Sequence, residues 1–103
     1  MIREISSKSY WTDEDGYLMN IEDWDEIWAQ ELAKDEEIEL TPEHWQVINA
    51  LHSFFVSYSL VPPIRIFKEE TGVSPRRIYE LFPSGPIKGA CRMAGLPKPK
   101  GCI

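Results

Sequence analysis

Proline and glycine divide the second half of the sequence into short segments, and this division most constrains the fold. All eight prolines lie between residues 42 and 99. Each proline ring removes a backbone donor and favours the first turn or the end of a helix. Four helices are therefore expected, over residues 42–60, 64–71, 76–82 and 86–94. Gly72 should close the second of these helices, and Gly95 is the expected left-handed stop of the fourth.

Two of these helix starts pair a hydroxyl side chain with proline. Thr41 precedes Pro42 and Ser74 precedes Pro75, which is the typical order of an N-cap and a first helical position. Between residues 42 and 60 the apolar side chains recur at helical spacing. They form a wide stripe that predicts a central core helix: Trp45, Val47, Ile48, Leu51, Phe54, Phe55 and Tyr58.

The first nineteen residues predict a small antiparallel β-hairpin. Residues 2–5 and 9–12 partly alternate between apolar and polar, Asp15-Gly16 is a turn signal, and an extended run resumes at residues 17–19. Strands this short must pack on helices to be stable. A further helix should follow, with Asn20 as its cap. Its apolar face comprises Trp24, Ile27, Trp28 and Leu32.

These elements predict a mainly α (α+β) fold. We expect a small orthogonal bundle of about five helices, with the hairpin region at residues 1–19 and a helix-turn-helix-like unit within residues 64–82. Residues 1–95 should form a single domain, because 103 residues leave room for one core. Residues 96–103 contain Pro97 and Pro99, which predicts an extended, mobile C-terminal arm.

Charge is distributed unevenly along the chain. The net charge is −6, which argues against nucleic-acid binding by bulk electrostatics. Residues 1–60 carry three basic and fourteen acidic side chains, whereas residues 61–103 carry eight basic and three acidic ones. The second part can therefore meet an anionic partner. No apolar run is long enough to cross a membrane and no secretory signal is visible, so the cytoplasm is the expected compartment.

The two cysteines are the unusual feature. Cys91 lies on the last predicted helix, where burial as a small apolar side chain explains it well. Cys102 is the second-last residue, at the end of the arm, and burial does not explain it. A disulfide between them would restrict the unfolded chain by roughly 3 kcal/mol, but the cytosol opposes it. A carrier thiol, Cys102, with Cys91 as resolving thiol fits better.

The arm itself suits a thiol that enters a partner protein. Seven residues beyond Gly95 reach about 20 Å at polyproline pitch. Gly101 leaves room for close approach beside Cys102, and the charges of Lys98 and Lys100 favour thiolate and attract anions.

DNA binding stays open as an alternative function, whereas a metal site shared by the two histidines is disfavoured. Arg76 and Arg77 begin the second helix of the helix-turn-helix-like unit, where a DNA-binding regulator would place its recognition residues. A tight helix-helix turn is also common in all-α domains that bind no DNA. His44 and His52 are eight residues apart on one helix, about 12 Å along its axis, so they cannot share a metal ion. No metal or cofactor site is expected in this chain.

The closing segment resembles the DsrC/TusE family, whose members are also called the gamma subunit of dissimilatory sulfite reductase or sulfur-relay proteins. The similarity rests on residues 84–103, SGPIKGACRMAGLPKPKGCI. Further similar motifs are Asp13-Glu-Asp-Gly-Tyr17, Leu40-Thr-Pro-Glu-His-Trp45, Pro63-Ile-Arg65 and Ile78-Tyr-Glu-Leu-Phe-Pro83. The resemblance runs from the hairpin to the last residue.

This resemblance implies a sulfur-carrying co-substrate with no catalytic cofactor of its own. Cys102 matches the family's sulfur-carrying thiol, and Cys91 matches the second cysteine of the DsrC branch. TusE-like members, which relay sulfur for tRNA 2-thiolation, typically lack that second cysteine and carry a longer insertion where this chain has only residues 71–75. Both features place the chain nearer DsrC.

The resemblance also implies partners. These are the alpha and beta subunits of dissimilatory sulfite reductase, sulfurtransferases, or a membrane complex that reduces a trisulfide formed by Cys91 and Cys102. Siroheme and iron–sulfur clusters would belong to the reductase. The residues expected to contact partners are Arg92, Lys98, Lys100 and Gly101. TusE-like relay and DNA-binding regulation are the alternatives, and the direction of sulfur flow stays open.

Overall fold

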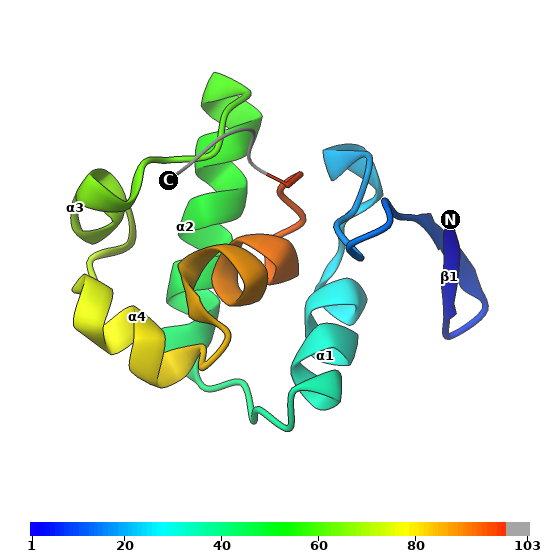
Figure 1. The fold of residues 1–103 in the computed structure, drawn as a ribbon, viewed down its shortest axis with the longest axis horizontal. Coiled ribbons are helices and arrows are strands. Elements are labelled where there is room, and N and C mark those ends of the chain that lie inside the picture. The colour runs from blue at the N-terminus through cyan, green and yellow to red at the C-terminus, as the bar shows by residue number, and fades with distance from the viewer. Residues whose placement is uncertain (99–103) are drawn as a thin grey trace.

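A central helix with shorter elements packed around it organises the computed structural model, which describes residues 1–98 (Figure 1). The central helix is α2 (Pro42–Tyr58), and α1 (Glu26–Asp35) and the hairpin lie on one side of it. On the other side lie α3 (Phe67–Thr71) and α4 (Pro75–Leu81), while the last helical segment, η3 (Pro86–Cys91), packs on α2. The expected mainly helical fold with an N-terminal hairpin is confirmed.

The hairpin consists of β1 (Ile2–Ile5) and β2 (Lys8–Trp11), paired antiparallel with Ile2 opposite Trp11. Its two-residue turn is Ser6-Ser7, both with positive φ, as a type I′ turn requires. The Asp15-Gly16 turn predicted from the sequence is present, but it closes only a single bridge between Thr12 and Leu18. β1 packs beside α1, and Tyr10 of β2 contacts Trp28 of α1 with ring centroids 5.3 Å apart.

The start of α1 differs from the prediction. Asn20 precedes a short 3-10 turn, η1 (Ile21–Asp23), and makes no capping bond with its side chain. The N-cap of α1 is Asp25, whose carboxylate accepts from the backbone N–H of Trp28 at 3.0 Å. The prediction of Asn20 as the cap was wrong because Asp25 offers the charged acceptor where the regular helix begins. Trp28 and Leu32 are buried as expected, whereas Ile27 is 42% exposed.

The central helix α2 begins as predicted. Thr41 and His44 form a reciprocal capping box, with Pro42 in the first turn. Val47, Ile48 and Leu51 are fully buried. The apolar stripe ends earlier than predicted, however, because Tyr58 is 62% exposed and only stacks beside Phe54. The last turn of α2 therefore projects beyond the core.

The second half contains the expected short elements. The 3-10 turn η2 (Ile64–Ile66) leads into α3, which ends at Gly72 with φ +75°. Ser74 caps α4 by accepting from the N–H of Arg77. The last helix differs from the predicted α-helix, because Pro86–Cys91 forms a π-helical turn and only Arg92 and Met93 continue as α-helix.

No helix within residues 1–98 combines the length and the apolar character needed to cross a membrane.

Candidate functional site

Cys91 is the last residue of η3, and its side chain is completely buried. It belongs to the main apolar core, together with Phe82, Met93 and Leu96. Burial raises the pKa of the Cys91 thiol well above its ordinary value, because the thiolate has no water to solvate it. The burial that the sequence predicted for Cys91 is therefore confirmed, and a buried thiol of this kind is a poor nucleophile while the conformation lasts.

The π-helical turn packs closely against the loop that precedes it. The amide N–H of Arg92 reaches the carbonyl of Ile87, five residues earlier. A Cβ atom at Gly89 would lie 3.0 Å from the Cβ of Phe82, so any larger residue would force Phe82 to shift. π-Turns occur frequently at functional sites because they shift the register of the residues that follow. Here Cys91 is the last residue of the π-helical turn.

A Schellman motif ends this helix and joins the arm to it. Gly95 adopts φ +84° and its N–H donates to the carbonyl of Arg92 at 3.1 Å. The N–H of Leu96 donates to the carbonyl of Cys91, also at 3.1 Å. This is the pair of bonds that defines the motif. The predicted left-handed stop at Gly95 is thus confirmed, and the base of the arm is bonded to the backbone of the cysteine itself.

Three side chains bond to the next carbonyls, and we call this set the carbonyl clamp: Trp24, Trp28 and His52. Trp28 Nε1 donates to the carbonyl of Arg92 at 2.9 Å, and Trp24 Nε1 donates to that of Met93 at 2.7 Å. His52 Nδ1 lies 3.0 Å from the carbonyl of Ala94. A carbonyl only accepts, so His52 donates through Nδ1. The rings of Trp24 and His52 also stack, with centroids 4.1 Å apart.

Sequence reasoning missed the carbonyl clamp. It placed Trp24 and Trp28 on an apolar face, and it took His52 for a structural or surface histidine without naming a partner. The available signal was chemical: a buried indole N–H needs an acceptor. That rule does not name the acceptor, because residues 92–94 are more than sixty positions away from both tryptophans.

Two of the predicted partner-binding residues are engaged within the chain. Arg92 Nη2 contacts Glu36 Oε2 at 3.3 Å, and both side chains are largely buried. Lys98 Nζ contacts Asp15 Oδ2 at 2.6 Å in an exposed pair. The hydrogen bond between them raises the pKa of Lys98 and lowers the pKa of Asp15. Lys100, Gly101 and Cys102 lie outside the described residues.

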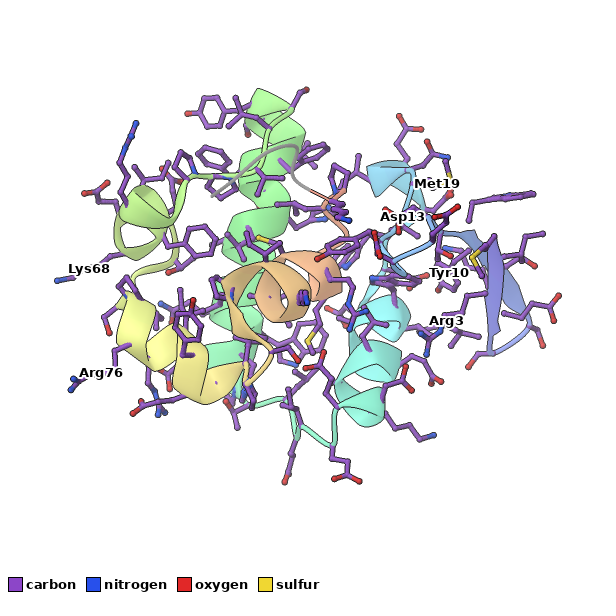
Figure 2. The ribbon with its side chains drawn as sticks, in the orientation of Figure 1. Arg3, Tyr10, Asp13, Met19, Lys68 and Arg76 are labelled. Carbon is purple, nitrogen blue, oxygen red and sulfur yellow. The ribbon has the colours of Figure 1, made fainter. Side chains whose placement is uncertain are left out.

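Of the two arginines at the start of α4, Arg76 and Arg77, one is exposed without an ion pair among residues 1–98. Arg77 donates to both carboxylate oxygens of Glu43 and to Glu80. Arg76 makes no ion pair in the described part of the chain. The side chains of Arg76 and Lys68 both point away from the body of the protein (Figure 2).

His44 has a structural role, because its Nε2 bonds to the carbonyl of Leu81 at 2.8 Å.

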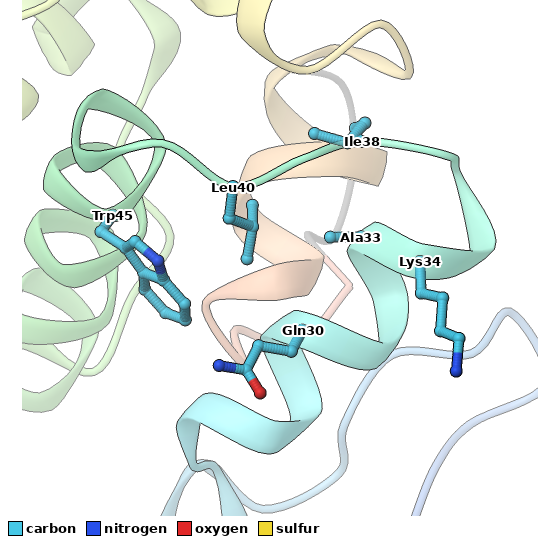
Figure 3. Close-up of a pocket in the computed structure, with 6 residues that line it drawn as sticks. All are labelled: Gln30, Ala33, Lys34, Ile38, Leu40 and Trp45. Carbon is cyan, nitrogen blue, oxygen red and sulfur yellow. The ribbon is translucent and has the colours of Figure 1, made fainter.

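A surface depression of about 350 Å³ lies between α1 and the start of α2 (Figure 3). Gln30 of α1 faces Leu40 and Trp45 across it, and Ala33, Lys34 and Ile38 complete its lining. No sequence motif predicted this depression. Cys91 is not among the residues that line it.

Comparison with known proteins identifies the class to which this fold and cysteine pattern belong. The family model described as "DsrC like protein" matches residues 4–103. The chain therefore belongs to the DsrC-like family.

Three relatives illustrate the range of that family. The dissimilatory-type sulfite reductase subunit gamma of Nitratidesulfovibrio vulgaris is 43% identical over 97 residues, covering 93% of this chain and 92% of the relative. The sulfurtransferase TusE of Photorhabdus laumondii is 47% identical over 100 residues, covering 89% of each chain. The crystal structure of the oxidized gamma subunit (DsrC) from Archaeoglobus fulgidus superposes with a TM-score of 0.86, at 44% identity and full coverage of both chains.

Proposed function

We propose that this protein is a sulfur carrier that serves as co-substrate of a dissimilatory sulfite reductase. In this proposal Cys102 holds the transferred sulfur and Cys91 is the resolving thiol. The observation that carries the proposal is the extent of the family match, which runs through both cysteines to residue 103. Siroheme and iron–sulfur clusters belong to the partner reductase, and the carrier provides only thiols.

The carrier chemistry needs two thiols of different reactivity. The Cys102 thiolate attacks the terminal sulfur of a persulfide or polysulfide donor, and the donor leaves as the thiolate or polysulfide one sulfur shorter. Cys102 then carries a persulfide. The Cys91 thiolate attacks the Cys102 sulfur of that persulfide, hydrosulfide leaves, and a Cys91–Cys102 disulfide forms. The burial of Cys91 supports this division, because it keeps the resolving thiol unreactive during loading.

The basic residues at the base of the arm can bind an acidic surface on a partner protein. Arg92 and Lys98 lie on the segment that leads to Cys102, and each is held by a carboxylate of the N-terminal half. The Lys98–Asp15 pair is exposed, and such pairs contribute little to stability. An acidic partner surface can therefore replace Asp15 at small cost. We propose the same role for Lys100, with Gly101 allowing close approach to Cys102.

A second candidate is a TusE-like relay that passes sulfur onward without a resolving thiol. The 47% identity to a TusE sulfurtransferase favours it. The two candidates differ in their need for Cys91. A relay passes its persulfide directly to the next thiol, whereas a co-substrate that releases sulfur by internal exchange requires Cys91.

Intact-mass spectrometry of cysteine variants tests the proposal. After incubation with inorganic polysulfide, the wild-type protein and Cys91→Ala should each gain sulfur, and Cys102→Ala should gain none. Only the wild type should then release hydrosulfide and lose the mass of two hydrogens as the disulfide forms. Stable sulfur on Cys102→Ala would overturn the assignment of the carrier thiol.

The same variants with sulfite and a purified dissimilatory sulfite reductase separate the two candidates. A co-substrate should lose turnover in both Cys91→Ala and Cys102→Ala. If Cys91→Ala supports full sulfite turnover, or if the wild type has no effect on the reductase, the TusE-like relay is the better description.

A further inference from the structure

We propose that Trp24, Trp28 and His52 are positioning residues that control when Cys91 becomes available to react. This inference rests on the proposed function, in which Cys91 resolves a persulfide on Cys102. None of the three side chains needs to touch the reacting sulfur. They act through the backbone of residues 92–94, to which each donates one hydrogen bond.

The carbonyl clamp completes the hydrogen bonding of a buried helix end. The last four carbonyls of a helix have no partner within the helix. Here the carbonyl of Cys91 accepts from Leu96, and that of Arg92 accepts from Gly95 and from Trp28. The carbonyls of Met93 and Ala94 accept from the clamp alone among the described contacts. Because Met93 and Ala94 are fully buried, loss of the bond from Trp24 or from His52 leaves an unsatisfied acceptor away from water, whereas loss of the Trp28 bond leaves the Arg92 carbonyl with Gly95 as its single donor.

The clamp joins three parts of the chain at the segment that separates the two cysteines. Trp24 follows η1, Trp28 belongs to α1 and His52 belongs to α2. Their acceptors are consecutive residues immediately after Cys91. Trp24 also packs on the turn itself, because a Cβ at position 95 would lie 2.6 Å from its Cδ1 atom. The end of η3 is therefore held from both sides of the bundle.

Movement of this segment is the step that exposes Cys91. The thiol has no solvent-accessible surface, so neither a persulfide nor an alkylating reagent reaches it while η3 and residues 92–96 keep their places. The Schellman bond ties the arm to the carbonyl of Cys91, so a pull on the arm is transmitted to that residue. The clamp bonds oppose the movement. Their strength sets the fraction of molecules in which Cys91 is exposed.

Labelling of Cys91 in a Cys102→Ser background measures that fraction directly. The test variants are Trp24→Phe, Trp28→Phe and His52→Phe. Each removes the N–H donor of one clamp bond. Trp24 is only half-buried, and His52→Phe keeps an aromatic ring beside Trp24. The matched control is Trp45→Phe, the same chemical change at a tryptophan of the α1–α2 depression (Figure 3). The probe is an aromatic disulfide reagent, used from zero denaturant to the start of the unfolding transition.

Each clamp variant should label about tenfold faster than the parent in the absence of denaturant, because one net hydrogen bond of about 1.4 kcal/mol corresponds to a factor of ten. The increase should depend little on denaturant, which is the signature of local opening. Trp45→Phe should label at nearly the parental rate. In chains that retain Cys102, the clamp variants should also release hydrosulfide about tenfold faster after polysulfide loading.

Three results would overturn the inference. The first is labelling by Trp24→Phe within twofold of Trp45→Phe. The second is faster labelling that follows the full denaturant dependence of global unfolding, since that reports lost stability rather than local opening. The third is faster labelling without faster hydrosulfide release. Failure of Cys102 to take up any sulfur contradicts the proposed function instead, and the first two labelling criteria then decide whether the clamp controls exposure of Cys91.

Discussion

The amide N–H of Leu96 donates to the carbonyl oxygen of Cys91 across 3.1 Å, so the first residue of the arm is part of the structure that buries the cysteine. Leu96 has no exposed surface, whereas Lys98 is exposed. The core therefore extends to Leu96, one residue beyond the predicted end of the domain.

Shortening Leu96 should destabilise the fold, whereas removing the residues beyond Lys98 should not. Leu96→Ala deletes a fully buried side chain and should lower the free energy of unfolding by about 2–4 kcal/mol. A chain that ends at Lys98 should keep its stability within about 0.5 kcal/mol, because surface residues contribute little. Urea unfolding at neutral pH measures both. A large loss in the truncated chain would mean that residues 99–103 are packed on the domain.

Gly95→Ala should be more harmful than the same change at Gly16. Both glycines have φ +84°, so alanine pays a similar left-handed backbone cost of about 1–2 kcal/mol at each. The added Cβ differs in its surroundings. At Gly16 it meets only the tip of Arg92 at 3.3 Å, whereas at Gly95 it meets three atoms of Trp24 within 3 Å.

We therefore expect Gly95→Ala to cost at least about 1 kcal/mol more than Gly16→Ala, because overpacking a closed site forces its neighbours to move. Thermal unfolding of the two variants beside the wild type measures the difference. Equal losses of stability in the two variants would show that the Trp24 side chain moves aside at little cost. That result would also weaken the argument that Trp24 holds the end of η3.

Local chemistry made the regular part of the fold predictable. Thr41-Pro42 and Ser74-Pro75 satisfy the first N–H groups of their helices with side chains only three residues away, so the sequence alone identifies them. Gly72 and Gly95 likewise predict left-handed helix ends, because this conformation depends on the glycine itself and not on a distant partner. The burial of Cys91 followed from its place among small and apolar neighbours on one helix.

Features that depend on distant contacts were not predictable. In the π-turn Gly89 packs on Phe82, and no helical pattern in the sequence encodes that approach. Tyr58 was placed in the core because the period of the stripe continues through it, but no element of the described chain covers that end of α2. Asn20 and Asp25 both fit the pattern of an N-cap, and only the η1 turn between them decides in favour of Asp25.

The start of α1 should make the fold sensitive to acid. Burial raises the pKa of Asp25, but hydrogen bonds from Lys8, the Tyr10 hydroxyl and the Trp28 N–H outweigh it and hold the pKa below its ordinary value. A carboxylate with a lowered folded-state pKa contributes stability that is present above the unfolded pKa of about 4 and is lost as the pH falls through the folded value.

Asp25→Asn separates this charge effect from helix capping, because asparagine caps almost as well as aspartate. We expect the variant to be less stable than the wild type at pH 7 and the gap to close as the pH falls below about 4. Urea unfolding between pH 2.5 and pH 7 measures this difference in stability. Lys8→Met is a second variant, which should show part of the same pH-dependent loss because it removes one of the bonds to Asp25. A gap that is constant over this range would contradict the assignment.

Binding to DNA should be weak and insensitive to Arg76. Of the two arginines at the start of α4, Arg77 is held by Glu43 at 2.8 Å and by Glu80 at 3.1 Å. These carboxylates neutralise the surface that would face a duplex, and the chain as a whole carries a net charge of −6. We expect duplex binding near physiological salt to stay at the non-specific level, and Arg76→Ala to change it less than twofold.

Fluorescence anisotropy with duplexes from the upstream region of the protein's own gene and with scrambled duplexes of equal length measures this binding at several salt concentrations. Glu43→Gln is the informative companion variant, because it frees Arg77 without removing any basic residue. If the wild type prefers one duplex at least tenfold over its scrambled version, and Arg76→Ala removes that preference, then the helix-turn-helix-like unit is a DNA reader and regulation becomes part of this protein's function.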